Sequence, residues 1–214
     1  IRDATGSVTD SNFTDNQNSI SNGGGALFIE NSSPELRNCN FIRNKTEANS
    51  FGGAIKLVNS NSKIENCTFK YNQNLKNSGG AIYIDQTSAP SLKNNEFQYN
   101  HSASWGGAIY CESQEVSISG GFFLGNWADY GGGVATNGTS QSNFDNIRIL
   151  GNEANASSNS QGGFLYLGTG STHSKFVNCV IAGNKSAYRH GVFSPKGLSL
   201  IHISGPTRLA EIAY

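Results

Sequence analysis

The feature that most constrains this chain is an internal repeat in which two short sequence markers alternate seven times. The first marker is Phe-x-x-Asn, with Ile in place of Phe in the last two copies. The second marker is a glycine pair followed by a small or apolar residue, and it follows each copy of the first. A fixed period of this kind indicates stacked structural units, each of which buries its apolar face against its neighbours.

The asparagine of the first marker recurs at intervals of 28, 28, 28, 26, 26 and 32 residues. These asparagines are Asn16, Asn44, Asn72, Asn100, Asn126, Asn152 and Asn184. The second marker reads Gly-Gly-Ala at 24–26, 52–54, 79–81 and 106–108, then Gly-Gly-Val at 132–134, Gly-Gly-Phe at 162–164 and His-Gly-Val at 190–192. The period is shorter than a propeller blade of about 40 to 45 residues, and no leucine-rich consensus is present.

Within each copy the apolar residues recur at a spacing of two, which is the pattern of β-strands. After the glycine pair, one position lies between two apolar positions. Its occupants are Phe28, Lys56, Tyr83, Tyr110, Thr136 and Tyr166. Because this column accepts a lysine, we expect it to face water.

Two further apolar columns lie five residues apart, and an odd spacing cannot place both inside unless the chain bends between them. The earlier column is Val8, Leu36, Ile64, Leu92, Ile118, Phe144 and Phe176, and the later one is the Phe or Ile of the first marker. Two residues beyond the earlier column stand Asp10, Asn38, Asn66, Asn94, Gly120, Asn146 and Asn178. All belong to the residue types that accept the left-handed conformation, so we predict a one-residue corner there.

Three short strands and a corner in about 28 residues describe one coil of a parallel β-helix. The sequence therefore predicts an all-β fold, a single right-handed parallel β-helix of about seven coils that spans residues 1–197. Strands of successive coils would pair in register about 4.8 Å apart. The seven repeat asparagines would then form a buried structural ladder of amides.

The combination of Gly-Gly-Ala-Ile and Phe-x-x-Asn resembles the repeats of the chlamydial polymorphic outer membrane proteins and of the wider right-handed β-helix, pectin-lyase-like class. The resemblance covers about residues 5–195. It implies a secreted or surface-exposed solenoid, often associated with adhesion, rather than an enzyme.

The last segment departs from the repeat, because residues 198–214 carry neither marker. Residues 198–203 could form one more strand, but the stretch 199–208 resembles translated sequencing-adapter sequence. We interpret 198–214 as a non-repeat tail and a candidate artefact. The chain also contains no Met, so we expect it to be a fragment or a mature product of a longer solenoid.

The charge balance argues against several classes of partner. Lys plus Arg and Asp plus Glu both number 15, so the formal net charge is zero and binding to nucleic acid is not expected. No apolar run is long enough to cross a bilayer, so no transmembrane segment is expected.

The four cysteines contain no Cys-x-x-Cys pair, and no histidine partners them, so no metal and no cofactor is expected. Cys39, Cys67 and Cys179 share one inward column, and Cys111 belongs to another. All four are interpreted as small core residues. A disulfide between Cys39 and Cys67 in adjacent coils is compatible with the spacing but not required by it.

Four residues are candidates for glycan binding on the outer face: Tyr83, Tyr110, Asp85 and Glu112. Exposed tyrosine rings can bind sugars through their apolar faces, whereas a cross-coil pair of rings could simply stabilise the sheet. The two carboxylates occupy equivalent positions in adjacent coils, where they could bind Ca²⁺ or share a proton. No basic residue joins them in register, which argues against catalysis.

Eight Asn-x-Ser/Thr sequons are present, of which Asn31, Asn137 and Asn155 lie in predicted loops and are the expected glycan acceptors in a secreted eukaryotic protein.

The favoured function is a non-enzymatic extracellular or surface-displayed scaffold for adhesion or recognition, with glycans or a host or cell-surface protein as partners. The alternative is a polysaccharide lyase or glycoside hydrolase of the pectin-lyase-like class. Acidic and basic side chains from three or more coils that converge in a cleft would favour the alternative.

Overall fold

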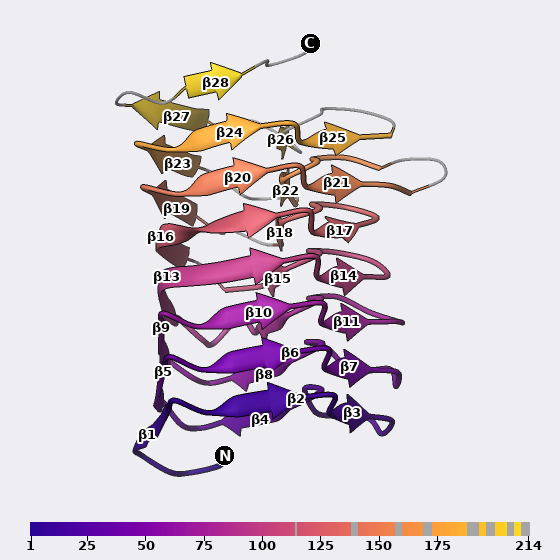
Figure 1. Cartoon of the computed structure of the whole chain (residues 1–214), viewed down its shortest axis with the longest axis vertical. Helices are drawn as coiled ribbons and strands as arrows, with labels where there is room; N and C mark the ends of the chain where they lie inside the picture. The colour runs from indigo at the N-terminus through magenta and orange to yellow at the C-terminus, as the bar shows by residue number, and fades with distance from the viewer. Residues whose placement is uncertain are drawn as a thin grey trace.

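Each repeat folds into short strands, and equivalent strands of successive repeats pair side by side in parallel in the computed structural model. The coils stack along the long axis of the molecule, with the two chain ends at opposite ends of the stack (Figure 1). The result is a right-handed parallel β-solenoid with about six turns of about 28 residues, close to the seven coils predicted. The structure describes residues 1–113, 115–137, 141–156, 160–168, 173–187, 193–195, 200–204 and 208–210.

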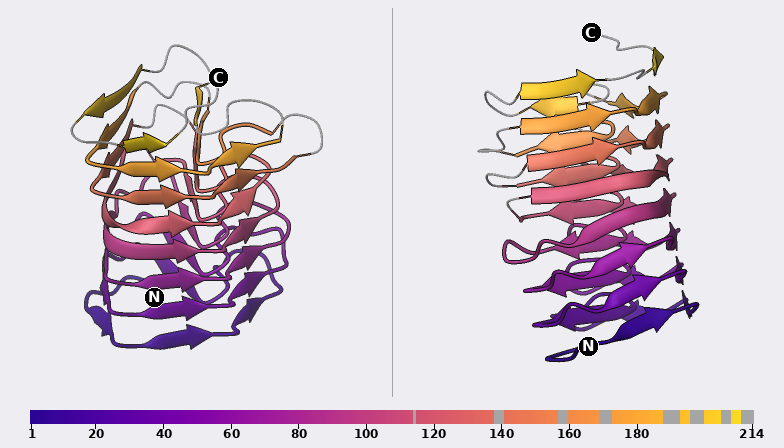
Figure 2. Two further views of the ribbon diagram at one scale, coloured as in Figure 1. Left: turned by 45° about the horizontal axis from the view of Figure 1, so that its top comes forward. Right: turned by 90° about the vertical axis from the view of Figure 1, so that its left-hand side faces the viewer.

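Three sheets form the walls of the solenoid, and Figure 2 shows their strands stacked like rungs. Sheet A contains β4 (Leu27–Glu30), β8 (Ile55–Val58), β12 (Ile82–Ile84), β15 (Ile109–Cys111), β18 (Val134–Thr136), β22 (Leu165–Leu167) and β26 (Phe193–Pro195). Sheet C contains β3 (Gln17–Asn18), β7 (Lys45–Thr46), β11 (Gln73–Asn74), β14 (His101–Ser102), β17 (Trp127–Ala128), β21 (Glu153–Ala154) and β25 (Lys185–Ser186).

Sheet B has 14 strands and bends along its middle. Its first half contains β1 (Ser7–Thr9), β5 (Glu35–Arg37), β9 (Lys63–Glu65), β13 (Ser91–Gln98), β16 (Glu115–Leu124), β19 (Gln141–Asp145), β23 (His173–Val177) and β27 (Leu200–Ser204). Its second half contains β2 (Asn12–Thr14), β6 (Asn40–Ile42), β10 (Thr68–Lys70), β20 (Arg148–Leu150), β24 (Val180–Ala182) and β28 (Arg208–Ala210), while β13 and β16 run through both halves.

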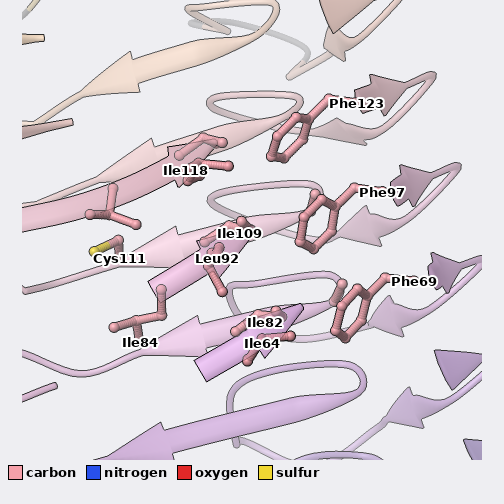
Figure 3. Packing of buried hydrophobic residues seen from close by; sticks show 14 of the residues in the cluster. Ile64, Phe69, Ile82, Ile84, Leu92, Phe97, Ile109, Cys111, Ile118 and Phe123 are labelled. Carbon is pink, nitrogen blue, oxygen red and sulfur yellow. The ribbon is translucent and has the colours of Figure 1, made fainter. Parts of the chain in front are cut away.

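The core lies inside the solenoid and is built from columns of identical or similar side chains (Figure 3). The phenylalanines of the first marker stack from Phe13 to Phe123 with ring centroids 4.7 to 4.9 Å apart. This distance equals the spacing of paired strands, so the rings follow the backbone without a shift. The two apolar columns five residues apart are both buried from the second coil onward, as the predicted bend requires, while Val8 and Phe13 in the first coil are partly buried.

The predicted corner is confirmed at every repeat. Its residues have φ between 49° and 66°, namely Asp10, Asn38, Asn66, Asn94, Gly120, Asn146 and Asn178. A second left-handed corner, which the sequence analysis missed, immediately precedes each ladder asparagine. Its residues are Asp15, Arg43, Tyr71, Tyr99, Gly125, Gly151 and Gly183, with φ between 53° and 64°. Arg and Tyr rarely adopt this conformation, so residue type gave little warning of this turn.

The seven repeat asparagines form one continuous row of hydrogen bonds. Each of the first six donates its main-chain N–H and its Nδ2 to Oδ1 of the next asparagine, at 2.8 to 3.1 Å. From Asn44 onward, Nδ2 also donates to the main-chain oxygen of the first-marker Phe or Ile in the preceding coil, at 2.8 to 3.2 Å. The five central amides, Asn44, Asn72, Asn100, Asn126 and Asn152, are fully buried and both donate and accept along this line.

The glycine pairs meet two separate needs of the backbone. The first glycine has φ between 63° and 77° at Gly52, Gly79, Gly106, Gly131 and Gly162. The second allows close contact between coils, because a Cβ on Gly107 would lie 2.1 Å from the main-chain oxygen of Gly132.

One register assignment from the sequence was wrong. Three consecutive glycines precede Val134, and the structure aligns Gly131 and Gly132 with the glycine pair of the preceding coil. Val134 therefore pairs with Ile109, and Ala135 rather than Thr136 continues the column of Tyr110. A run of three glycines can be aligned with a glycine pair in two ways. The sequence-based alignment used Gly132 and Gly133, whereas the structure uses Gly131 and Gly132.

Strand pairing continues past the boundary that the sequence analysis placed at residue 197. β27 pairs with β23, and β28 pairs with β24, both in parallel. The backbone of these tail segments thus adds a further partial coil.

Replacing Asn72 by Leu should destabilise the fold strongly, because it removes the acceptor of the Asn44 amide and the donor to the Phe41 carbonyl. Buried polar groups without a partner cost about 1 to 3 kcal/mol each, so we expect a loss of about 3 kcal/mol or more. Asn49→Leu is the control, since Asn49 is exposed and its Oδ1 accepts one hydrogen bond from Asn77 at 3.3 Å. Urea unfolding followed by circular dichroism measures both variants, and equal free energies of unfolding would contradict a stabilising ladder.

Gly107→Ala should also be strongly destabilising, because its methyl group would collide with the backbone of Gly132. Gly151→Ala is the matched control: a Cβ there meets nothing within 4 Å, although its φ of 60° is unfavourable for alanine. That backbone strain costs about 1 to 2 kcal/mol. The melting temperature should fall clearly further for Gly107→Ala, and the reverse order would disprove the close-contact role.

Candidate functional site

The four candidate residues lie together on the outer side of sheet A. Tyr83 and Tyr110 pair in register between β12 and β15. Asp85 and Glu112 follow these strands in adjacent coils, and the Glu112 N–H donates to the Ile84 carbonyl at 2.9 Å. The predicted neighbourhood of the four residues is therefore present.

The prediction that this column faces water was wrong. Tyr83 is 7% exposed, Tyr110 is 1% exposed and Lys56 is 9% exposed. Their side chains point away from the main core, but together with Ala135 the tyrosines form a second apolar cluster. An open platform of the Tyr83 and Tyr110 rings is therefore excluded by burial.

Aromatic residues from the loops before the glycine pairs cover the column. The Phe51 ring stacks on Tyr83 with centroids 4.5 Å apart, and the Trp105 ring tilts against Tyr110 at 5.4 Å. Burial raises the pKa of both tyrosine hydroxyls, which therefore stay protonated at neutral pH. The loops turn an outward-facing strand position into an interior one.

Lys56 brings a positive charge to this cluster from the neighbouring column, since it pairs in register with Tyr83 while Val58 occupies the carboxylate position of its coil. Its ammonium lies 5.4 to 6.0 Å from the ring centroids of Phe28, Phe51 and Tyr83. Burial lowers the pKa of Lys56, while the charges of Glu30, Asp85 and Glu112 act in the opposite direction. Charged groups from four coils thus converge here.

The two candidate carboxylates are already engaged within the protein. Asp85 closes a turn by accepting hydrogen bonds from the Ser88 hydroxyl at 2.6 Å and the Thr87 hydroxyl at 2.8 Å. Glu112 accepts a hydrogen bond from the Tyr83 hydroxyl at 2.8 Å. These bonds give both carboxylates a structural role.

A different set of aromatic residues lies at the surface, on and beside sheet C. We call Tyr71, Tyr99, His101 and Trp127 the aromatic strip. Tyr71 and Tyr99 are 44% and 43% exposed and stack at 5.4 Å, while Trp127 is 42% exposed and stacks on His101 at 3.4 Å. This strip was not predicted from the sequence, although residues on either side of an inward-pointing asparagine are expected to point outward.

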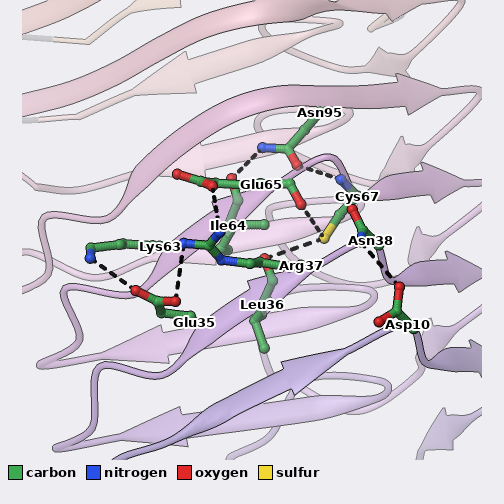
Figure 4. A network of polar contacts seen from close by, with 10 residues as sticks. All are labelled: Asp10, Glu35, Leu36, Arg37, Asn38, Lys63, Ile64, Glu65, Cys67 and Asn95. Carbon is green, nitrogen blue, oxygen red and sulfur yellow. Dashed lines mark hydrogen bonds and ion pairs between the residues drawn. The ribbon is translucent and has the colours of Figure 1, made fainter.

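Four charged side chains on the outer face of sheet B, from β5 and β9, form a network of ion pairs (Figure 4). Lys63 lies 2.9 Å from Glu35, and Arg37 lies 3.1 Å from Glu35 and 3.7 Å from Glu65. These exposed ion pairs, two of which join adjacent coils, contribute little to stability.

The four cysteines are free and buried, as expected for small core residues. Burial raises the pKa of the Cys67 thiol to about 12 and that of Cys111 to about 11, so neither thiolate is available at neutral pH. No disulfide joins Cys39 and Cys67.

Within the described residues, no three His, Cys, Asp or Glu side chains are grouped so that they could hold a metal ion. The same part of the chain contains no helix of the length and apolarity needed to cross a membrane.

Comparison with protein families agrees with this architecture. The family model described as "Right handed beta helix region" matches residues 2–105 and 74–204, which together span most of the chain. The chain therefore belongs to the right-handed β-helix family. Searches of curated proteins and of solved structures gave no significant match.

The stability of the protein should depend on the protonation of His101. Burial lowers the pKa of this imidazole from 6.5 to about 4, so between these values the unfolded chain binds a proton that the folded chain does not. Stability should therefore fall as the pH drops from about 6.5 to about 4. His101→Gln should reduce this dependence, because glutamine does not titrate in this range. The fold should accept the substitution, since Gln73 occupies the equivalent position in the preceding coil. Melting temperatures across this range measure the effect, and identical pH profiles for the two proteins would contradict it.

Proposed function

We propose that this chain is a non-enzymatic scaffold that acts outside the cell or on its surface in adhesion or recognition. The observation that carries the proposal is the contrast between its two aromatic clusters. The charged cluster around Lys56 is covered by rings and bonded internally, whereas the aromatic strip is open to solvent. A partner can therefore reach aromatic rings more readily than potential acid and base groups.

The repeat supports this proposal in a second way. The glycine and asparagine markers resemble those of the chlamydial polymorphic outer membrane proteins, a resemblance that suggests display and adhesion. Glycans, or a host or cell-surface protein, are the partners that fit a long, regular surface with exposed aromatic side chains.

The alternative function is that of a carbohydrate-active enzyme of the pectin-lyase-like class. One observation favours it, the convergence of Lys56 with Glu30, Asp85 and Glu112 from four coils. A lysine with a lowered pKa can serve as a base, and a tyrosine hydrogen-bonded to a carboxylate can transfer a proton. For catalysis, however, the ring of Phe51 would have to move away from Tyr83.

The purified chain should release no reducing ends or unsaturated products from polygalacturonate, xylan or β-glucan, with or without Ca²⁺. It should nevertheless be retained on immobilised extracellular-matrix extract in surface plasmon resonance. Release of products that disappears in both Lys56→Met and Glu112→Gln would establish the enzyme and overturn the scaffold. Absence of retention on any cell-surface or matrix preparation would also count against the scaffold.

A further inference from the structure

A small depression lies beside the aromatic strip on sheet C. It has a volume of about 240 Å³ and is lined by Gly125, Trp127, Gly151, Glu153 and Asn155. None of these residues belongs to the charged cluster around Lys56, so the depression is a separate feature of the surface.

The depression exists because two successive coils have glycine at the second corner. Earlier coils carry side chains at this position, such as Arg43, Tyr71 and Tyr99. The Tyr99 ring extends over Gly125, where an added Cβ would lie 2.7 Å from the ring. At Gly151 an added Cβ would meet nothing within 4 Å, so the space above it is open.

Trp127 forms an aromatic wall of this space. One face of its ring is covered by the His101 imidazole, which is nearly parallel to it at 13°. The other lining residues include Gly151, Glu153 and Asn155 of the next coil, which lies on the opposite side of Trp127 from His101. The second ring face therefore borders the depression, and Trp127 as a whole is 42% exposed.

Polar groups surround the ring on the next coil. Glu153 contributes a carboxylate, and exposed Asn155 contributes an amide. Lys185 lies 3.8 Å from the carboxylate of Glu153 and balances its charge. His101 adds no charge at neutral pH, because burial lowers the pKa of its imidazole to about 4.

We propose that this depression binds one neutral pyranose residue of a glycan, with the apolar face of the sugar on Trp127 and its hydroxyl groups near Glu153 and Asn155. An aromatic ring beside carboxylate and amide groups complements a sugar, which has C–H groups on its face and hydroxyl groups on its rim. An acidic sugar would find no uncompensated positive charge here, because Lys185 is already paired with Glu153. An apolar peptide side chain would find a floor of glycine backbone and a polar rim.

This inference deepens the proposed recognition function and depends on it. The probes are three soluble neutral polysaccharides, β-1,3-glucan, galactomannan and xylan, together with acidic polygalacturonate. Affinity gel electrophoresis is performed with chain produced in bacteria, so that the sequon at Asn155 carries no glycan of its own. At least one neutral polysaccharide should retard the protein, and polygalacturonate should not.

Trp127→Ala should weaken this binding at least about tenfold, the equivalent of about 1.4 kcal/mol. The matched control is Leu75→Ala, because Leu75 is similarly exposed at 39% but does not line the depression. Binding by this control should stay within about twofold of the original chain, by the usual size of surface effects. Circular dichroism melts establish that both variants are folded.

A second variant fills the depression instead of removing its wall. Gly151→Asn adds a side chain to open space at a φ that asparagine accepts, so it should block binding while preserving the fold. The inference is overturned if no neutral polysaccharide retards the chain, if polygalacturonate alone does, or if both Trp127→Ala and Gly151→Asn bind normally. Retention on matrix extract that persists in both variants would overturn this site alone, whereas polysaccharide cleavage would overturn the scaffold function.

Discussion

The pairing of each coil with the next, residue for residue, is the constraint on which the rest of this structure depends. Parallel strands in strict register place equivalent residues directly above one another. Each residue type in a column must therefore be able to pack or form hydrogen bonds against copies of itself. Asparagine meets this demand with an amide that donates and accepts along the column. Phenylalanine meets it by stacking at the strand spacing. Glycine meets it where the main chains of adjacent coils come too close for a Cβ.

This constraint also explains which parts of the fold could be predicted from the sequence. The core columns, the ladder and the first corner repeat with the same residue types, so their periodicity was sufficient to identify them. The second corner was missed because Arg43, Tyr71 and Tyr99 carry no preference for the left-handed conformation. The register at Val134 was wrong because a run of three glycines has no internal marker. Position in the repeat thus predicts conformation only where the residue type is informative.

The candidate site was predicted less well, for a different physical reason. Alternation along a strand shows that Lys56, Tyr83 and Tyr110 point out of the solenoid, but it says nothing of what covers them. Phe51 and Trp105 come from irregular loops, whose paths are not fixed by pairing in register. These loops exclude water from the column and change the environment of every charged group in it. Outward orientation and exposure are therefore separate properties, and only the first can be read from periodicity.

In such a repeat, a binding function is expected where the residue type of a column changes while the strands of adjacent coils remain paired. In the second corner, large side chains give way to Gly125, Gly151 and Gly183, and the backbone keeps the same φ throughout. The scaffold is unchanged there, but its surface becomes hollow beside Trp127. The ladder and the core hold that ring in place through the strand that carries it, so the ring needs no support from the loops. The binding site proposed there would combine a backbone held by pairing in register with an outer face whose side chains can vary from coil to coil.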